Sequence, residues 1–364
     1  MINKILYKNI TNVELPDREI YRKIRERWDR LAKPIDSLGK FEDIVAVIGS
    51  IRGTTKVDIE KRILIMICAD NGIVGRGVTQ SGQEVTKEVA EWMGNNKSSV
   101  CIMAKVAGVD TLPVDVGINM EGSPKGVLNR KVRRGTKDFL SEPAMSDVEF
   151  EEALNIGIDL VRECVEKGYS IIATGEMGIG NTTTASAVCA ALLGCSAKEV
   201  TGRGAGIPDS GYVAKIEVIN KALFKYGLSD CKNEDADYAK RVAMSVGGLD
   251  IVALAGVYIG GLVYRIPIII DGFISAVAAL LAERLIPGTR EIMIPSHMGK
   301  EKGMKNVLKE LKLDPPIDAS LALGEGSGAI MLFPLLDMVL ALYGNGYVFE
   351  ETKIQQYDRF EDLK

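Results

Sequence analysis

The chain has 364 residues, of which 46% are hydrophobic and 6% aromatic, and it contains 38 glycines. This length and the many small and aliphatic side chains favour a large α/β domain, alone or with a small one, over a β-sandwich. The formal net charge is −4 with acidic and basic residues interspersed, so we expect no nucleic-acid partner.

Cysteine and histidine usage narrows the chemistry. The six cysteines form no Cys-x-x-Cys pair and are interpreted as buried thiols of a cytoplasmic protein. Residues 1–12 contain no long apolar segment, so no secretory signal is predicted. His297 is the only histidine, which argues against a Ser-His-Asp triad or a zinc site. We predict neither a metal ion nor a cofactor.

The N-terminal part of the chain predicts a small helical unit. Apolar residues from Ile20 to Leu31 recur at helical spacing, and Pro34 ends that helix. A second helix is expected over residues 38–48, where the apolar spacing is similar. The predicted domains are a small helical domain of residues 1–55 and about 340–364, and a large α/β domain of residues 56–339.

Near-continuous aliphatic runs separated by helical stretches begin at about residue 60. Such runs are typical of parallel strands that are covered by helices on both faces, so we predict a Rossmann-like, mostly parallel sheet. Functional residues should then follow the carboxyl ends of the strands, where ligands bind in such sheets. The predicted strands are Arg62–Cys68, Thr111–Val116, Ser170–Thr174, Ile266–Ile270 and Glu291–Ile294.

The longest apolar tract extends from Ile251 to Ala282. Arg265 and Asp271 interrupt it, and each uncharged piece is shorter than the ~20 residues that a membrane-spanning helix needs. The tract therefore predicts a buried helix, a strand and another helix, and no membrane span.

Two capping-box patterns mark predicted helix starts. Ser146 with Glu149 precedes an amphipathic stretch, and Ser81 with Glu84 repeats the pattern after the loop at Asp70.

The segment Gly175–Thr184 carries the strongest chemical signal. Its glycines Gly175, Gly178 and Gly180 let the backbone approach a ligand closely, and a helix of small residues follows. Free N–H groups at that helix start, with the hydroxyls that follow Asn181, suit a phosphate. The glycine spacing matches neither a Walker loop nor a dinucleotide fingerprint. The alternative is an ordinary glycine-rich turn with Asn and Thr caps.

A second glycine cluster contains Gly202, Arg203 and Gly204, and Lys215 follows it. The two clusters and the lysine could close around one phosphate, with Lys215 as a point charge. A flexible loop before a helix with a solvated lysine is the alternative interpretation.

The third segment, Leu323–Gly328, places Glu325 between two glycines ahead of an apolar helix. A carboxylate on such closely approachable backbone suits a general base. Alternatively, Glu325 caps the helix that follows it.

Asp271 ends a predicted strand and is therefore placed for ligand contact, although turn formation explains it equally well. Gln83 offers an amide to a ring or a sugar, and it could also be a surface group.

Together these segments resemble the nicotinate-nucleotide:dimethylbenzimidazole phosphoribosyltransferase family. The resemblance covers roughly residues 20–345, and the glycine and glutamate segments occur in the family's order. Its parts are Leu31–Lys40, Ala69–Thr86, Asp115–Gly117, Gly175–Thr183, Gly202–Gly206, Gly247–Gly248, Asp271–Ser275, Ser296–His297 and Leu323–Gly328.

The resemblance implies transfer of 5-phosphoribosyl from nicotinate mononucleotide to an aromatic lower-ligand base of a cobamide, in a homodimeric enzyme with a small helical domain. Glu325 matches the family's catalytic base. Residues matching the acceptor-base region are Gln83, Ser81, Glu176, Met177 and Leu323. Residues assigned to the nucleotide and its phosphate are Gly178, Gly180, Asn181, Thr182, Thr183, Gly202, Arg203, Gly204, Lys215 and Asp271.

One residue departs from the family pattern. Asn71 stands where many members carry His, and we expect this to change acceptor contacts and not the reaction. A phenolic lower ligand and a heterodimer with a paralogue are therefore two further hypotheses. Two other hypotheses are a non-catalytic subunit that binds nicotinate mononucleotide and a nicotinamide-dependent oxidoreductase, although the latter lacks the dinucleotide fingerprint.

Overall fold

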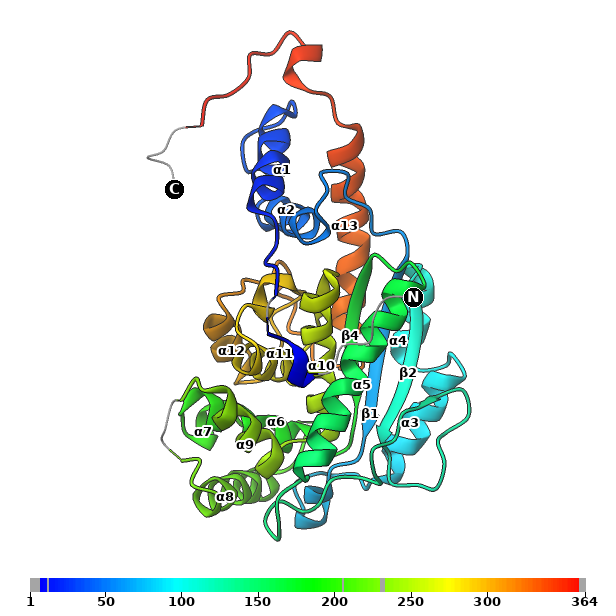
Figure 1. Ribbon diagram of the computed structural model, residues 1–364, viewed down its shortest axis with the longest axis vertical. Coiled ribbons are helices and arrows are strands. Elements are labelled where there is room, and N and C mark those ends of the chain that lie inside the picture. The colour runs from blue at the N-terminus through cyan, green and yellow to red at the C-terminus, as the bar shows by residue number, and fades with distance from the viewer. Residues whose placement is uncertain (1–6, 12, 205, 230–232, 360–364) are drawn as a thin grey trace.

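The computed structural model describes residues 7–11, 13–204, 206–229 and 233–359, so Ala205 and Cys231 lie outside the described residues. Figure 1 shows a large α/β body from which a smaller helical part projects at one end. The elements are η1 (Tyr7–Asn9), α1 (Arg18–Arg30), α2 (Lys40–Arg52), β1 (Arg62–Ala69), η2 (Gly72–Arg76), α3 (Glu84–Gly94), α4 (Ser99–Val106), β2 (Asp110–Gly117), β3 (Leu128–Asn129), α5 (Asp147–Glu166), β4 (Ile171–Met177), α6 (Asn181–Leu193), α7 (Ala197–Val200), α8 (Asp209–Lys225), α9 (Ala236–Val246), α10 (Leu249–Tyr264), β5 (Ile268–Ile270), α11 (Phe273–Leu285), η3 (Thr289–Ile292), β6 (Met293–Pro295), α12 (Met304–Leu311), α13 (Ser327–Asn345) and η4 (Phe349–Glu351).

The sheet has six strands in the order β3-β2-β1-β4-β5-β6, and every pairing is parallel. The chain leaves β1 for β2 on one side and later returns to β4 on the other. This reversal opens a crevice at the carboxyl ends of β1 and β4, which is where ligands bind in such sheets. The predicted parallel α/β sheet is confirmed.

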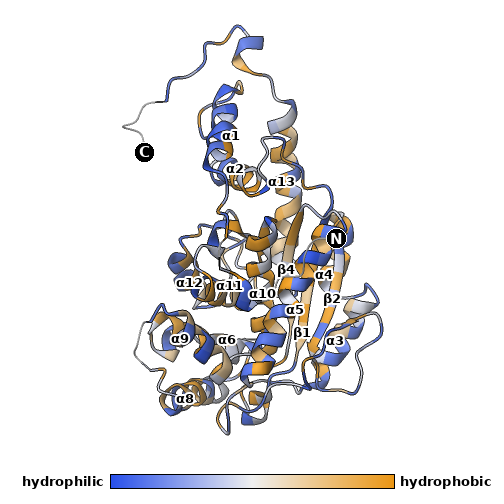
Figure 2. Ribbon diagram, viewed as in Figure 1, coloured by the Kyte–Doolittle hydropathy of each residue, from blue (hydrophilic) through white to orange (hydrophobic). Residues whose placement is uncertain are grey.

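Both faces of the sheet are covered by helices, as the aliphatic strands require. Along β1, Ile63, Ile65 and Ile67 pack into the core beneath α5, α6, α10 and α11. The alternate residues Leu64 and Met66 pack into a second core with α4 and α13. Figure 2 shows this apolar interior as orange strands at the centre of the molecule.

The projecting part is built from α1, α2 and the end of α13. Trp28 of α1, Val45 of α2 and Tyr343 of α13 are buried in one cluster. The polar C-terminal stretch returns to this helical pair, because Arg359 pairs with Asp29 at 2.7 Å and with a second aspartate nearby. Whether these segments form a separate domain with the boundaries given above stays a prediction.

Most predicted elements are confirmed, and one helix start is wrong. The strands match the aliphatic runs, and α5 begins with the Ser146–Glu149 capping box. The apolar tract forms α10, β5 and α11. The predicted box at Ser81 does not form, because α3 starts at Glu84 after Gln83, which makes no side-chain cap.

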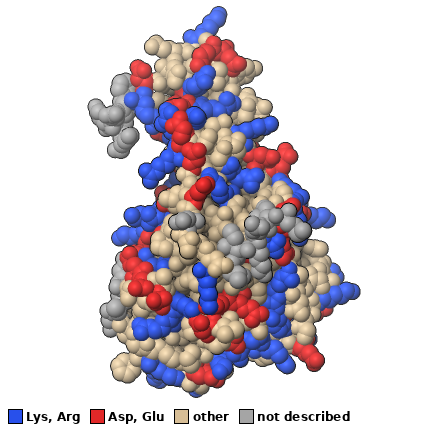
Figure 3. Space-filling model, viewed as in Figure 1, with Lys and Arg blue, Asp and Glu red and all other residues tan. Residues whose placement is uncertain are grey.

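One described helix, α13, is long and apolar enough by length and composition to cross a membrane, and half of its most apolar window is buried inside the molecule. The charged side chains in Figure 3 are interspersed over the face shown, with no continuous basic track on that face.

Helices α5 and α10 cross at glycines. A Cβ atom on Gly157 would lie 2.0 Å from the carbonyl oxygen of Ala253, and one on Gly256 would lie 2.1 Å from that of Leu154. Both obstacles are backbone atoms, which cannot rotate away. Glycine is therefore required for this helix contact.

We expect Gly157→Ala to lower the free energy of unfolding by about 1–3 kcal/mol or more, because the helices must separate. The matched control is Gly344→Ala, at an exposed helical position with nothing within 4 Å of the added Cβ. Helix propensity predicts that the control stabilises the protein by up to ~1 kcal/mol. Urea denaturation measures both, and equal effects would contradict the close helix contact.

Candidate active site

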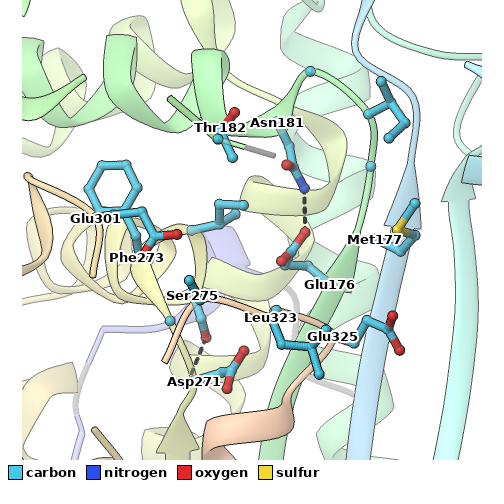
Figure 4. A pocket seen from close by; sticks show the side chains of 18 of the residues that line it. Glu176, Met177, Asn181, Thr182, Asp271, Phe273, Ser275, Glu301, Leu323 and Glu325 are labelled. Atoms are coloured by element: carbon cyan, nitrogen blue, oxygen red, sulfur yellow. Dashed lines mark hydrogen bonds between the residues drawn. The ribbon is translucent and has the colours of Figure 1, made fainter. Parts of the chain in front are cut away.

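A cavity of about 290 Å³ lies at the carboxyl ends of the central strands. Its walls come from the end of β4, the start of α6, the residues after β5 and the loop before α13. Figure 4 shows Glu176, Asp271 and Glu325 approaching it from three of these segments. The sequence-predicted glycine segments therefore meet around one cavity.

Glu176 lies at the carboxyl end of β4, one residue before the strand ends. Next to it, Gly175 allows the loop before α13 to approach, since a Cβ there would lie 2.3 Å from the carbonyl oxygen of Glu325. Gly178 allows a similar contact, because its Cβ would lie 2.3 Å from the carbonyl oxygen of Ala69. These glycines bring backbone to backbone, as the sequence indicated.

The Glu176 carboxyl group is held by the amide of Asn181. The Asn181 Nδ2 atom donates to Glu176 Oε2 and also to Asp250 Oδ2, the latter at 3.1 Å. Burial and then the negative charge of Asp250 raise the pKa of Glu176 to about 8. Burial raises the pKa of Asp250 to about 6, although its bond from Asn181 opposes the change.

The other side of the cavity is suited to an anion. Helix α6 starts after Gly180, whose φ is 92°, and its first turn presents Thr182 to the cavity. The Thr182 hydroxyl accepts a hydrogen bond of 2.9 Å from Lys215 Nζ. Gly204 closes in from the second glycine cluster, where a Cβ would lie 3.0 Å from that hydroxyl. A helix N-terminus, a hydroxyl and an ammonium group thus meet here.

Lys215 is only 1% exposed although it carries a charge. Burial lowers the pKa of Lys215 to about 8, while the negative charge of Glu301 opposes the change. Among the described residues no ion pair joins Lys215 to a carboxylate, so a bound anionic ligand would favour its charged form.

Asp271 holds the start of α13. Its Oδ1 atom accepts from the N–H groups of Gly328 and Ala329, at 2.8 and 3.1 Å, and its Oδ2 accepts from Gly326 at 3.0 Å. Burial raises the pKa of Asp271, and the nearby His297 opposes this. Asp271 also lines the cavity, and its predicted contact with the nucleotide stays a prediction.

Glu325 lines the cavity but does not cap its own helix. Its φ is 61°, a left-handed conformation that is unusual for a glutamate. The Oε2 atom accepts from the N–H of Val100 at 3.4 Å, in the first turn of α4. The dipole of that helix favours a negative charge at this position. Helix α13 takes its cap from Asp271, so the alternative interpretation of Glu325 is wrong.

Most of the sequence-predicted site residues are brought together. Those that line the cavity are Ser81, Glu176, Met177, Gly178, Gly180, Asn181, Thr182, Arg203, Gly204, Asp271, Leu323 and Glu325. Lys215 lies behind Thr182, and Gly202 and the buried Thr183 do not line the cavity. Gln83 is also outside it, because its amide donates to the carbonyl of Asn71 at 3.2 Å and accepts from Asn119 at 3.0 Å.

Asn71 is fully buried and does not line the cavity. Its Oδ1 atom accepts from the Thr184 hydroxyl at 2.8 Å, and its amide lowers the pKa of Asp250. Any effect of Asn71 on the acceptor must therefore be indirect, and the expectation that it changes acceptor contacts stays a prediction. Sequence reasoning missed Asp250, whose only signal was the preceding pair Gly247–Gly248, and it missed Glu301.

Asp271→Ala should lower the free energy of unfolding by about 3 kcal/mol or more, because buried N–H groups lose their acceptor. The matched control is Asp17→Ala, which removes an exposed cap that accepts from Glu19 and Ile20. That loss should be only ~1 kcal/mol. Urea denaturation compares them, and a loss at Asp271 no larger than the control's would contradict the capping role.

Comparison with known proteins gives the same family throughout. A family model described as phosphoribosyltransferase matches residues 13–354. The nicotinate-nucleotide–dimethylbenzimidazole phosphoribosyltransferase of Clostridium perfringens is 40% identical over 364 residues, which are 100% of this chain and 98% of that protein. The protein of the same name from Acetivibrio thermocellus is 38% identical, over 97% of this chain and 99% of its own.

The fold is shared as well. The crystal structure of CobT from Thermus thermophilus superposes with a TM-score of 0.86 at 34% identity, covering 93% of this chain and 100% of that chain.

Proposed function

The chain belongs to the phosphoribosyltransferase family of the nicotinate-nucleotide–dimethylbenzimidazole enzymes, and from this membership we propose its reaction. It transfers the 5-phosphoribosyl group of nicotinate mononucleotide to dimethylbenzimidazole or a related benzimidazole or phenol. The products are nicotinate and α-ribazole phosphate, or the corresponding α-riboside phosphate of another acceptor. This step activates the lower ligand during assembly of the cobamide nucleotide loop.

The observation that carries the proposal is the division of one cavity into an acidic side and an anion-binding side. The buried Lys215 and the first turn of α6 suit the donor phosphate. Glu325 and Glu176 line the other side, next to Met177 and Leu323, where an apolar acceptor ring fits.

In the proposed step, a ring nitrogen of the acceptor attacks C1′ of the donor ribose. The bond from C1′ to the pyridinium nitrogen breaks, and its electron pair returns to that nitrogen, giving neutral-ring nicotinate. Glu325 takes the N–H proton of the benzimidazole ring, or the O–H proton of a phenol, whose oxygen is then the nucleophile. Because the leaving group is already cationic, its departure needs no acid. Holding the two rings in line supplies much of the rate.

Glu325→Gln should lower turnover of nicotinate mononucleotide with dimethylbenzimidazole by about 10²–10⁴-fold, because glutamine cannot accept the proton. Donor affinity, measured by calorimetry, should fall far less than turnover. The control is Glu121→Gln, at an exposed glutamate outside the cavity, which should retain full turnover. Full turnover in the Glu325 variant would remove it as the base.

The second candidate function is a non-catalytic or partner-dependent subunit that binds nicotinate mononucleotide. This second candidate is suggested by Asn71, which departs from the residue that many family members carry at that position. Assay of the purified chain alone separates the two, since only an enzyme forms product without a paralogue. The cytoplasmic location stays a prediction.

We propose that the chain forms a homodimer through the outer faces of α4 and α13. On α4, Ile102 and Val106 are 61% and 87% exposed, and on α13 Met338 is 62% exposed. The two helices pack against each other beneath these side chains. Apolar residues repeated on neighbouring exposed helices suit a symmetric interface that buries them.

Met338→Glu should therefore shift the protein from dimer to monomer, because a buried, unpaired carboxylate opposes association. Sedimentation equilibrium measures the mass. Phe224→Glu is the control, since Phe224 is 83% exposed on α8 and should leave the dimer intact. A wild-type chain that sediments as a monomer would contradict the homodimer.

A further inference from the structure

Asp250 lies directly behind the cavity wall, and no reaction step above uses it. It is fully buried at the start of α10, and Asn181 beside it is 4% exposed. A single amide NH₂ group of Asn181 stands between the Asp250 carboxyl group and that of Glu176. The two acids therefore share one hydrogen-bond donor.

Glycines on both sides close this arrangement. A Cβ on Gly178 would lie 2.9 Å from Asp250 Oδ2 and 3.3 Å from Asn181 Nδ2. A Cβ on Gly248 would lie 2.3 Å from Asp250 Oδ1. Any other residue at these positions would push the carboxyl groups apart, so the backbone is shaped around the pair.

Three acidic side chains face Glu176: Asp250 from α10, Asp271 from the end of β5 and Glu325 from the loop before α13. The Cys68 thiol of β1 also faces it but stays neutral, because burial raises the pKa of that thiol well above its usual value. In the part of the chain that the structure describes, no ion pair joins Glu176 or Asp250 to a basic side chain. Two adjacent carboxyl groups without a cation cannot both ionise easily.

We propose that Asp250 is a positioning residue whose negative charge, held across Asn181 from Glu176, keeps Glu176 a neutral carboxylic acid when the phosphoribosyl donor binds, against the hydrogen bond from Asn181, which favours the ionised form. The inference rests on the proposed function. The Oε2 atom of Glu176 is tied to Asn181, so Oε1, which lies 3.4 Å from the Cβ position of Gly324, is the oxygen left for a ligand. In the neutral acid it can donate a hydrogen bond to an oxygen of the nucleotide. An ionised Glu176 could not donate this hydrogen bond.

Asp250 loses its proton at a lower pH than Glu176, as the proposal requires. The pKa of Asp250 is raised to about 6 and that of Glu176 to about 8, so near neutral pH Asp250 carries the charge and Glu176 the proton. The neutral form of Glu176 persists below its raised pKa and is lost as the pH rises through it. Removing the charge of Asp250 lowers the pKa of Glu176, so the neutral form is then lost at a lower pH.

The test is calorimetric binding of nicotinate mononucleotide between about pH 6 and 9, without acceptor. Wild-type affinity should fall as the pH passes about 8, and Asp250→Asn should move that fall to a pH lower by on the order of one unit. A merely structural residue would change the affinity without moving the profile. An unmoved profile in the variant overturns the inference.

Lys215 titrates in the same pH range, because burial lowers its pKa to about 8. The group that acts on Lys215 is Glu301 and not Asp250, so the Asp250→Asn variant leaves the contribution of Lys215 in place. The difference between wild type and variant therefore reports on Glu176.

Glu176→Gln supplies a second test that does not depend on the folding of the Asp250 variant. Glutamine keeps a hydrogen-bond donor and cannot ionise, so nicotinate mononucleotide should still bind. Above about pH 8, its binding to the variant should take up one proton fewer than its binding to the wild type. In this background Asp250→Asn should no longer move the profile, and a shift that remains overturns the inference. If nicotinate mononucleotide fails to bind the wild type at any pH, the proposed function fails instead.

Discussion

The site depends on the way Asp271 ties the end of β5 to the start of α13. Three backbone N–H groups around Glu325 donate to this one carboxyl group. They hold Glu325 at a φ of 61°, which a glutamate would not keep without such constraints. The same loop lies against β4 only because position 175 has no side chain. The position of the acid is thus set by the sheet and not by the loop itself.

The parallel sheet explains why so few segments suffice to build the cavity. Each strand delivers its following residues to the same edge, and the reversal between β1 and β4 separates the loops enough to leave space between them. The start of α6 then supplies free N–H groups, while the end of β4 supplies Glu176. The connection between β4 and α6 therefore contributes residues to both the anion-binding side and the acidic side.

Local features of this fold could be predicted from sequence, and long-range pairings could not. Aliphatic runs identified the strands, and glycine spacing identified the loops that line the cavity. The cap of α13 could not be predicted, because Asp271 lies 55 residues before Gly326 and the local pattern offered Glu325 instead. The position of Gln83 outside the cavity could not be predicted for a similar reason, since its partners Asn71 and Asn119 belong to other segments. Asp250 carried no motif, because its role comes from one amide across the fold.

The charges of the cavity match the proposed donor from end to end. Nicotinate mononucleotide carries a phosphate at one end of its ribose and a cationic ring at C1′. The cavity offers a helix N-terminus and Thr182, with the buried Lys215 behind it, on one side and the carboxylate of Glu325 on the other. A cationic ring is attracted to the acidic side until the bond at C1′ breaks, and the neutral ring that leaves is not. The same carboxylate that favours binding of the donor thus also favours release of nicotinate.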